Sequence, residues 1–517
     1  ADYWLADMRA YAVWARVIET LAAVGYDDRT LHVASFDWRL SLHELEARDA
    51  YFSRLRAHIE LNTRLHGERT YLIGHSFGGN VAHYFLHWST SAARGDDAGA
   101  WLRKHVAGFI DIGAPLLGVG KSLAALLTGQ MQQTVRIEEL ARRVLGITLS
   151  EQLSRSDIAH GSRSLGSLAA MTPRGGHAVW GDADGAPEHF ITMHEPPGDD
   201  GGDDDDAMYE QCKPPVRADD DHWRSRVLPS RAVRREARRV RNMTIEQTFA
   251  TLFSLSPTYA ALHRRHYSVG AAMGGGIQHD ERDDGDDVRR RWANPLEAAL
   301  PDGGGATFRV VCMYGVGMAT ERAFVLERAP PTCAVGEADL PLRVATQYHD
   351  EARGIRNGIA FVDGDSTVPL QSLGFMCAHA WRRRSHNPHG ATVVTREYRH
   401  RPQRGELHRF NALRLIDSIV DSARGGTSSG DHVDIMNNNA MLLDLVLEVS
   451  TASDACRDGA DDERRRQCAA LVRGVDARTG KPADRFHSDV AAVSRRIAQR
   501  LGWPADDDGA ALPSPPP

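Results

Sequence analysis

The segment RTYLIGHSFGGNVAHYFLHW, residues 69–88, places one serine between an apolar run and a helical pattern. Residues 69–73 are typical of a short buried strand, and apolar side chains recur at helical spacing after the glycines. Gly74, Ser76 and Gly78 form the pattern GxSxG at the junction. A strand that turns directly into a helix strains the middle residue, and the flanking glycines leave room for the neighbouring chain. The segment predicts an exposed serine nucleophile, with a purely structural turn as the alternative.

The predicted helix after Ser76 would assist such a nucleophile. Its positive N-terminal end points toward the hydroxyl, and the backbone N–H of Phe77 can donate to a developing oxyanion. We therefore expect Phe77 to contribute to an oxyanion hole.

Composition and charge indicate a globular protein without a strong electrostatic bias. The chain has 517 residues, 42% of them hydrophobic, and 62 Lys and Arg against 69 Asp and Glu, a net charge of −7. Such a balance gives no overall basic field, so we expect no nucleic-acid partner. No run of about 18 apolar residues is present, so this chain is not predicted to span a membrane by itself.

The N-terminus and the cysteines bear on targeting and redox state. The chain begins at Ala1 without a signal pattern, and we expect that a signal, an anchor or a whole N-terminal segment has been removed. Six cysteines without a CxxC pair predict one or two disulfides at most.

The first 130 residues alternate between helical and strand patterns. This alternation predicts an α/β fold with a mostly parallel sheet, in which ligands lie at the carboxyl ends of the strands, as Ser76 would. The expected elements are helices at 11–24 and 44–66, strands at 31–36 and 105–112, and a strand at Thr70.

Four regions are expected along the chain. Residues 1–130 are the N-terminal part of an αβ-hydrolase core with the nucleophile, and residues 131–300 are a large inserted cap. Residues 301–450 are the C-terminal part of the core with the acid and the histidine, and residues 451–517 are a polar, peripheral and partly disordered tail.

The inserted region contains two charged low-complexity stretches. GDDGGDDDDAMYEQC, residues 198–212, and RAVRREARRVR, residues 231–241, cannot form a core by themselves and are predicted to be loop within the cap. The arginine run is also compatible with a helix on an anionic membrane surface, although a solvated helix or disordered arm is the more common case.

A serine nucleophile needs a histidine base and an orienting carboxylate, which follow the serine in the order acid, then histidine in αβ-hydrolases. Asp363 and Asp365 follow an apolar run in GIAFVDGDSTVP, and Asp365 is the better placed, with a turn stabilised by Asx hydrogen bonds as the alternative. Asp111, at the end of an earlier strand, is a competing acid. His432 lies late, in a glycine- and serine-rich loop before the last leucine-rich helix, although a lone loop histidine is ordinarily surface filler.

A histidine pair on the predicted helix after Ser76 is a candidate for a zinc-binding site. His83 and His87 have the spacing of a zinc pair, but Tyr84 follows His83 where HExxH has glutamate. We therefore expect no metal and no other cofactor.

Eight blocks of the sequence together resemble the phospholipid:diacylglycerol acyltransferases, relatives of lecithin:cholesterol acyltransferase. The resemblance covers about residues 1–450, and several blocks lie outside any general hydrolase motif. In chain order the blocks are SFDWRLS, GHSFGG, IDIGAPLLGVGKSLAALLTG, MTPRGGHAVWG, WANPLEAALP, MYGVGMATERAFV, FVDGDSTVPL and DHVDIMNN.

The resemblance implies Ser76, Asp365 and His432 as a catalytic triad. It implies transfer of a fatty acyl group from a phospholipid to diacylglycerol through an acyl-enzyme at Ser76, at a membrane surface on the lumenal side of the endoplasmic reticulum. A lipase or phospholipase, or a non-catalytic lipid-binding relative, is the alternative. The resemblance also implies that an anchor, a first core strand and a loop with the second oxyanion amide precede Ala1.

Three further expectations accompany the resemblance. The cap and the apolar segment 116–127 would line a lipid-facing cavity that excludes water. Trp38 would form an apolar wall of the substrate site, with a plain core tryptophan as an equal alternative. Cys312 and Cys377 would pair, as a relative has a bridge in this region, with two free buried thiols as the alternative.

Overall fold

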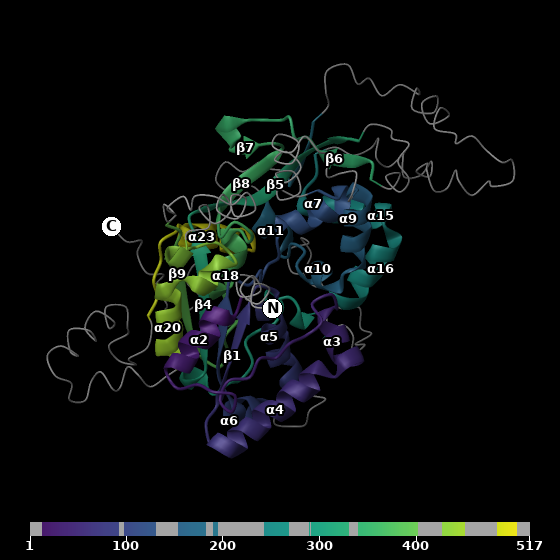
Figure 1. Ribbon diagram of the computed structural model, residues 1–517. Coiled ribbons are helices and arrows are strands. Elements are labelled where there is room, and N and C mark those ends of the chain that lie inside the picture. Colours follow the sequence, from purple (N-terminus) through teal and green to yellow (C-terminus); the bar gives the residue numbers. More distant parts are fainter. Residues whose placement is uncertain are drawn as a thin grey trace, which may run out of the picture.

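A four-stranded parallel sheet forms the centre of the chain (Figure 1). The computed structural model describes residues 13–91, 98–130, 154–181, 190–194, 242–267, 289, 291–329, 340–401, 426–449 and 483–503. All neighbouring strands are parallel, and every residue of β4 is buried, as expected where helices cover both faces of a sheet. In spatial order the strands are β1 Thr70–His75, β2 Val106–Ile112, β4 Arg309–Val316 and β9 Thr392–Arg399.

Alternate side chains of the central strands enter two different apolar clusters, because successive residues of a strand point to opposite faces. Phe109 and Val310 pack with α3, α4, α5 and α6 in the larger cluster, to which α18 and α23 also belong. Ile110 and Val311 pack with α2 and α20 in the smaller one. The helices are α2 Ala15–Ala23, α3 Leu42–Asp49, α4 Tyr51–His66, α5 Phe77–Ser89, α6 Ala98–His105, α18 Leu370–Ala378, α20 Asn439–Val449 and α23 Val490–Arg500.

A second, mixed sheet continues from the core after Gly317, whose φ of +92° allows the chain to turn between β4 and β5. The long strand β5 pairs antiparallel with β8, and β8 leads directly to Asp365. The apolar run before Asp365, within the predicted C-terminal part of the core, therefore lies in this second sheet and not in the central one. The strands are β3 Ile191–Met193, β5 Met318–Arg328, β6 Leu342–Val344, β7 Ile355–Arg356 and β8 Ile359–Gly364.

A group of helices lies beside the second sheet, at the upper right of Figure 1. Two of them begin with a capping box, Ser154 with Asp157 and Thr244 with Gln247, which satisfies backbone N–H groups that the helix start leaves unpaired. One of these helices, α7, follows β2, and the others belong to the described part of the predicted cap. They are α7 Gly120–Thr128, α9 Arg155–Ser164, α10 Gly166–Ala170, α11 Gly176–Trp180, α15 Ile245–Leu255 and α16 Pro257–His266.

The acidic stretch 198–212 and the arginine run 231–241 lie outside the described residues. The boundaries of the four expected regions stay a prediction, while the expected α/β class with a mostly parallel core sheet is confirmed. Short 3₁₀ turns complete the description: Gly305–Thr307, Glu351–Arg353, Ala380–Arg382, Gly426–Ser428 and Asp434–Asn437.

Two elements near the N-terminus differ from the sequence-based prediction. Residues 31–36 are irregular rather than a strand, since no neighbouring strand among the described residues pairs with them. The helix expected at 44–66 is broken into α3 and α4 at Ala50, which adopts a left-handed conformation with φ of 47°.

The prediction of a peripheral tail is wrong for residues 483–503. Glu397 of β9 accepts hydrogen bonds from the backbone N–H groups of His487 and Ser488, and Val490 is fully buried against α18. Helix α23 explains the discrepancy, because its few apolar side chains lie on one face and that face packs onto the core. Among the described residues, no helix is both long enough and apolar enough to cross a membrane.

Candidate active site

Ser76 occupies a sharp turn between β1 and α5. Its backbone angles, φ 54° and ψ −129°, lie in a region that non-glycine residues rarely adopt, which is the strain expected of a nucleophile elbow. The Ser76 N–H donates to the carbonyl of Ile112 at 3.0 Å, so the turn is held against the end of β2. The serine remains partly exposed.

Close packing explains the glycine requirement of this turn, although not at every glycine of the pattern. A side chain at Gly74 would lie 2.5 Å from the carbonyl oxygen of Gly78, so the crossing of β1 and α5 requires glycine there. A Cβ atom added at Gly78 would meet no other atom within 4 Å, whereas one added at Gly79 would lie 2.4 Å from Cβ of Ala114. The steric role expected for Gly78 therefore belongs to Gly79.

The structure brings Ser76, His432 and Asp365 together in one hydrogen-bonded chain. Nε2 of His432 lies 2.8 Å from Oγ of Ser76, and Nδ1 of His432 lies 2.7 Å from Oδ2 of Asp365. Both His432 and Asp365 are buried, with exposed fractions of 6% and 1%. In this geometry His432 can accept the serine proton while its other ring nitrogen donates to the carboxylate.

Several contacts orient the carboxylate of Asp365. Its Oδ1 accepts the backbone N–H groups of Thr367 and Val368 at 3.0 and 2.7 Å, which leaves Oδ2 for His432. The backbone carbonyl of Asp365 also accepts the N–H of His432 at 2.8 Å. The acid and the base are thus joined through both side chain and main chain.

Two residues that the sequence analysis did not single out lie beside this pair. Asp431, directly before His432, accepts a hydrogen bond from the hydroxyl of Ser366 at 2.7 Å and so joins the base loop to the acid turn. Gly113 has φ of +63°, and a side chain there would lie 3.4 Å from Oδ2 of Asp365 and 3.5 Å from Nδ1 of His432. Only the glycine in DIGAP, next to a strand end, offered a sequence signal for either role.

The structure places the two competing acids away from His432. Asp363 is exposed, and its Oδ1 accepts the N–H groups of Gly317 and Gly364, so it stabilises the turn between the strands. Asp111 is buried behind the elbow, where Oδ1 accepts the N–H of Ala114. Burial raises the pKa of Asp111 to about 7, because a charged carboxylate would lose its hydration there.

The two remaining expected site residues, Phe77 and Trp38, are not part of this hydrogen-bonded group. Phe77 is the first residue of α5, so its N–H precedes the intrahelical hydrogen bonds and is available near Ser76. Trp38 has 60% of its surface exposed, which rules out the alternative of a core tryptophan. Its contact with substrate stays a prediction.

His83 and His87 lie in the core rather than at the site. Their Nε2 atoms are 3.3 Å apart, and His83 stacks on the ring of Trp381. Burial lowers the pKa of both histidines, to about 4 for His87, so both remain neutral. Among the described residues no group of three His, Cys, Asp or Glu side chains is arranged to hold a metal ion.

The predicted disulfide between Cys312 and Cys377 is confirmed, with a Cα–Cα distance of 6.2 Å. It joins β4 to α18, the helix that begins at Leu370 just after the acid turn. The bridge therefore anchors the segment that carries Asp365 to the central sheet.

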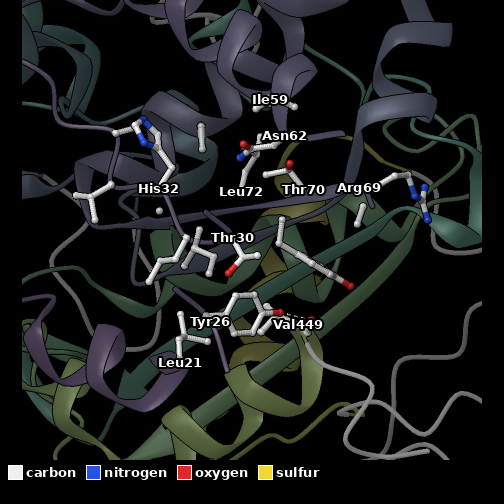
Figure 2. Close-up of a pocket in the computed structure, with 18 of the residues that line it drawn as sticks. Leu21, Tyr26, Thr30, His32, Ile59, Asn62, Arg69, Thr70, Leu72 and Val449 are labelled. Atoms are coloured by element: carbon white, nitrogen blue, oxygen red, sulfur yellow. Dashed lines mark hydrogen bonds between the residues drawn. The ribbon is translucent and has the colours of Figure 1, made fainter. Parts of the chain in front are cut away.

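Ser76 lines neither of two cavities that are enclosed by described residues. The larger, about 1080 Å³, runs along the open edge of β1; Figure 2 shows Thr70 and Leu72 between Ile59 and Asn62 on one side and Leu21 and Tyr26 on the other. The smaller, about 410 Å³, lies between α11 and α15. The apolar segment 116–127 is almost entirely buried in the packing around α7, so the expected lipid-facing cavity over Ser76 stays a prediction.

Comparison with known proteins identifies the family. A family model described as "Lecithin:cholesterol acyltransferase" matches residues 2–439. The phospholipid:diacylglycerol acyltransferase of Schizosaccharomyces pombe is 29% identical over 451 residues, 87% of this chain and 61% of that protein. The enzyme of that name from Saccharomyces cerevisiae is 28% identical over 87% of this chain and 58% of its own length. A putative phospholipid:diacylglycerol acyltransferase 2 of Arabidopsis thaliana is 28% identical over 97% of this chain and 76% of its own.

This chain therefore spans about three-fifths of the length of the two yeast relatives. The family model nevertheless covers Ser76, Asp365 and His432 together with both sheets. The protein has an αβ-hydrolase fold in which Ser76, His432 and Asp365 are joined by hydrogen bonds. Because the family model matches residues 2–439, the protein belongs to the lecithin:cholesterol acyltransferase family.

Proposed function

We propose that the protein transfers a fatty acyl group from a phospholipid to diacylglycerol, with Ser76 as nucleophile, His432 as general base and acid, and Asp365 as the orienting carboxylate. The observation that carries the proposal is the chain of hydrogen bonds from Ser76 through His432 to Asp365 at a strained elbow. The relatives named phospholipid:diacylglycerol acyltransferase support the choice of donor and acceptor.

In the first half-reaction Oγ of Ser76 attacks the ester carbonyl of the phospholipid while His432 Nε2 takes its proton. The negative charge on the carbonyl oxygen is stabilised by the N–H of Phe77 and the N-terminal end of α5. The tetrahedral intermediate then collapses, and His432 returns the proton to the departing alkoxide. The products are lysophospholipid and an acyl ester on Ser76.

In the second half-reaction the hydroxyl of diacylglycerol replaces water as the attacking group. His432 accepts the hydroxyl proton, the oxygen bonds to the acyl carbon, and the proton returns to Oγ of Ser76 as triacylglycerol leaves. Water is present at tens of molar, so the site must exclude it or bind the acceptor well enough to outcompete it. We propose that the cap region supplies this selectivity.

Lipid substrates imply that the protein works at a membrane surface, and we propose the lumenal face of the endoplasmic reticulum. The disulfide between Cys312 and Cys377 supports an oxidising compartment, since such bridges are rare in reducing ones. Exposed Trp38 is suited to the boundary between lipid and water, because its ring is apolar and its indole N–H is polar. Trp38→Ala should raise the KM for substrate in vesicles while leaving cleavage of a water-soluble ester unchanged.

The test of the function is the partition of the acyl group. The protein is incubated with vesicles of acyl-labelled phosphatidylcholine and diacylglycerol, and labelled triacylglycerol and free fatty acid are measured. We expect triacylglycerol to exceed fatty acid and Ser76→Ala to abolish both products. Ser91→Ala, which changes a serine just beyond the end of α5, is the matched control and should behave as the parent.

Two other outcomes would replace the proposal. Release of mainly free fatty acid despite abundant diacylglycerol would identify a lipase or phospholipase that uses the same acyl-enzyme. Binding of the vesicles without turnover of either lipid would identify a lipid-binding relative.

A further inference from the structure

His75, the residue before the proposed nucleophile, makes a contact that the triad chemistry does not use. It is the last residue of β1, and its Nε2 lies 2.8 Å from the backbone carbonyl oxygen of His432. The two imidazole rings are 5.1 Å apart between centroids, although the residues are separated by 357 positions in the chain. The strand that leads into Ser76 thus contacts the loop that carries the base.

The chemistry of this contact fixes the state of His75. A carbonyl oxygen can only accept, so Nε2 of His75 must carry the proton and donate it. Burial, followed by the nearby imidazole of His432, lowers the pKa of His75 to about 4. The side chain is therefore a neutral donor at physiological pH.

The other hydrogen bonds of His432 show why this donor matters. The backbone N–H and Nδ1 of His432 both bond to Asp365, and these two bonds tie the base to the acid turn. The bond from His75 ties the base to β1, the strand that ends at His75 and leads directly into Ser76. The distance between Ser76 Oγ and His432 Nε2 depends on how these two units of the chain are held together.

Neutrality is equally important for the base. When His432 takes the serine proton it becomes a cation, and a second positive charge about 5 Å away would oppose this step. Histidine held neutral by burial donates a hydrogen bond without adding that charge, which lysine or arginine could not do.

We propose that His75 is a positioning residue that holds His432 in register with Ser76 through its hydrogen bond to the His432 carbonyl. The proposal rests on the proposed function, in which Ser76 and His432 are nucleophile and base. It predicts that losing the donor slows the attack by Ser76 without changing the binding of the reagent.

The experiment measures the rate at which a fluorophosphonate labels Ser76 in purified protein. His75→Leu removes the donor at similar size, and His75→Met does so with a more flexible side chain. His75→Gln places an amide N–H at a reach similar to that of Nε2. We expect His75→Leu and His75→Met to lower the maximal labelling rate roughly 10- to 100-fold at an unchanged half-saturating concentration, and His75→Gln to recover most of it.

Two controls separate positioning from a general loss of structure. His66→Leu changes an exposed histidine at the end of α4 and should label at the parent rate. In a His432→Ala background, His75→Leu should cause no further loss, because a residue that acts through the base has nothing left to position.

The outcomes distinguish this inference from the proposed function. Labelling of His75→Leu at the parent rate, equally slow labelling of His75→Gln, or a further loss in the His432→Ala background would each overturn the role of His75. Normal labelling of His432→Ala, or turnover by Ser76→Ala, would instead overturn the proposed function.

Discussion

Replacement of Asp365 by asparagine is expected to place the proton of His432 on the wrong nitrogen while leaving the fold intact. In the native protein Oδ1 of Asp365 accepts two backbone N–H groups and Oδ2 accepts Nδ1–H of His432. Asparagine has one oxygen and one NH₂ group where Asp365 has two oxygens. Its single oxygen can therefore accept either from the two backbone N–H groups or from Nδ1–H of His432, but not from both.

The two orientations of the new amide differ in free energy. If the NH₂ group faced the N–H groups of Thr367 and Val368, two backbone donors would lose their acceptor, at about 1–3 kcal/mol each. If the oxygen stays on those groups, the NH₂ group faces Nδ1 of His432, which must then become an acceptor. The second orientation is favoured, and it moves the ring proton to Nε2, where it prevents His432 from accepting the proton of Ser76.

The magnitude follows from the loss of the correct tautomer. An equivalent change in a serine triad lowers turnover roughly 10⁴-fold with little change in geometry, and such a factor corresponds to about 5 kcal/mol of activation free energy. The matched control is Asp363→Asn, which alters an exposed carboxylate that bonds only to Gly317 and Gly364 among its described contacts. We expect that variant to retain at least a tenth of the parent rate.

The assay combines fluorophosphonate labelling of Ser76, acyl transfer between lipids and thermal unfolding of the parent and both variants. Asp365→Asn should unfold within a few degrees of the parent, because its backbone hydrogen bonds persist. A rate for Asp365→Asn within tenfold of the parent, or a greater loss in Asp363→Asn, would refute the reasoning.

Three further predictions concern stability. Because the pKa of Asp111 rises from 3.8 to about 7 on folding, the folded state binds the extra proton, and stability falls as pH increases from about 4 to 7, by on the order of 4 kcal/mol. Asp111→Asn keeps the bond to Ala114 and should raise Tm more at pH 8 than at pH 4; an equal change at both values would contradict the assignment. Replacing Cys312 and Cys377 together by serine removes a bridge across 65 positions and should lower the free energy of unfolding by roughly 4 kcal/mol. The Tm of this variant should be lower than that of the parent and should no longer respond to reductant. Gly79→Ala should destabilise the elbow whereas Gly78→Ala should not, and the opposite order in denaturant unfolding would show that the packing is misassigned.

Much of the site was predictable because its signals are local. The turn around Ser76 could be recognised from residues within ten positions of it, since strand periodicity, helix periodicity and the steric freedom of glycine act over short distances. The order of serine, acid and histidine then restricted the search for partners to the later part of the chain. Asp365 and His432 were found in this way, and the structure places both in hydrogen-bonded contact.

The choice of carboxylate shows where local information ends. Asp363 and Asp365 are two positions apart in the same turn, and both can form Asx hydrogen bonds. The pairing of β8 with β5 decides between them, because it leaves Asp363 exposed and Asp365 buried beside His432. The sequence favoured Asp365 without containing the reason.

The α/β class, the strands at Thr70 and 105–112 and the strained serine could be predicted from the sequence alone, because each depends on the pattern of neighbouring residues. Long-range packing settled which sheet receives β8, whether residues 31–36 form a strand and whether α23 packs on the core. The hydrogen bond from His75 to His432 is likewise settled by long-range packing, since it joins residues 357 positions apart. Such contacts depend on where the folded chain brings distant segments together, and the free energy that selects them comes from burial and hydrogen bonding across the whole core.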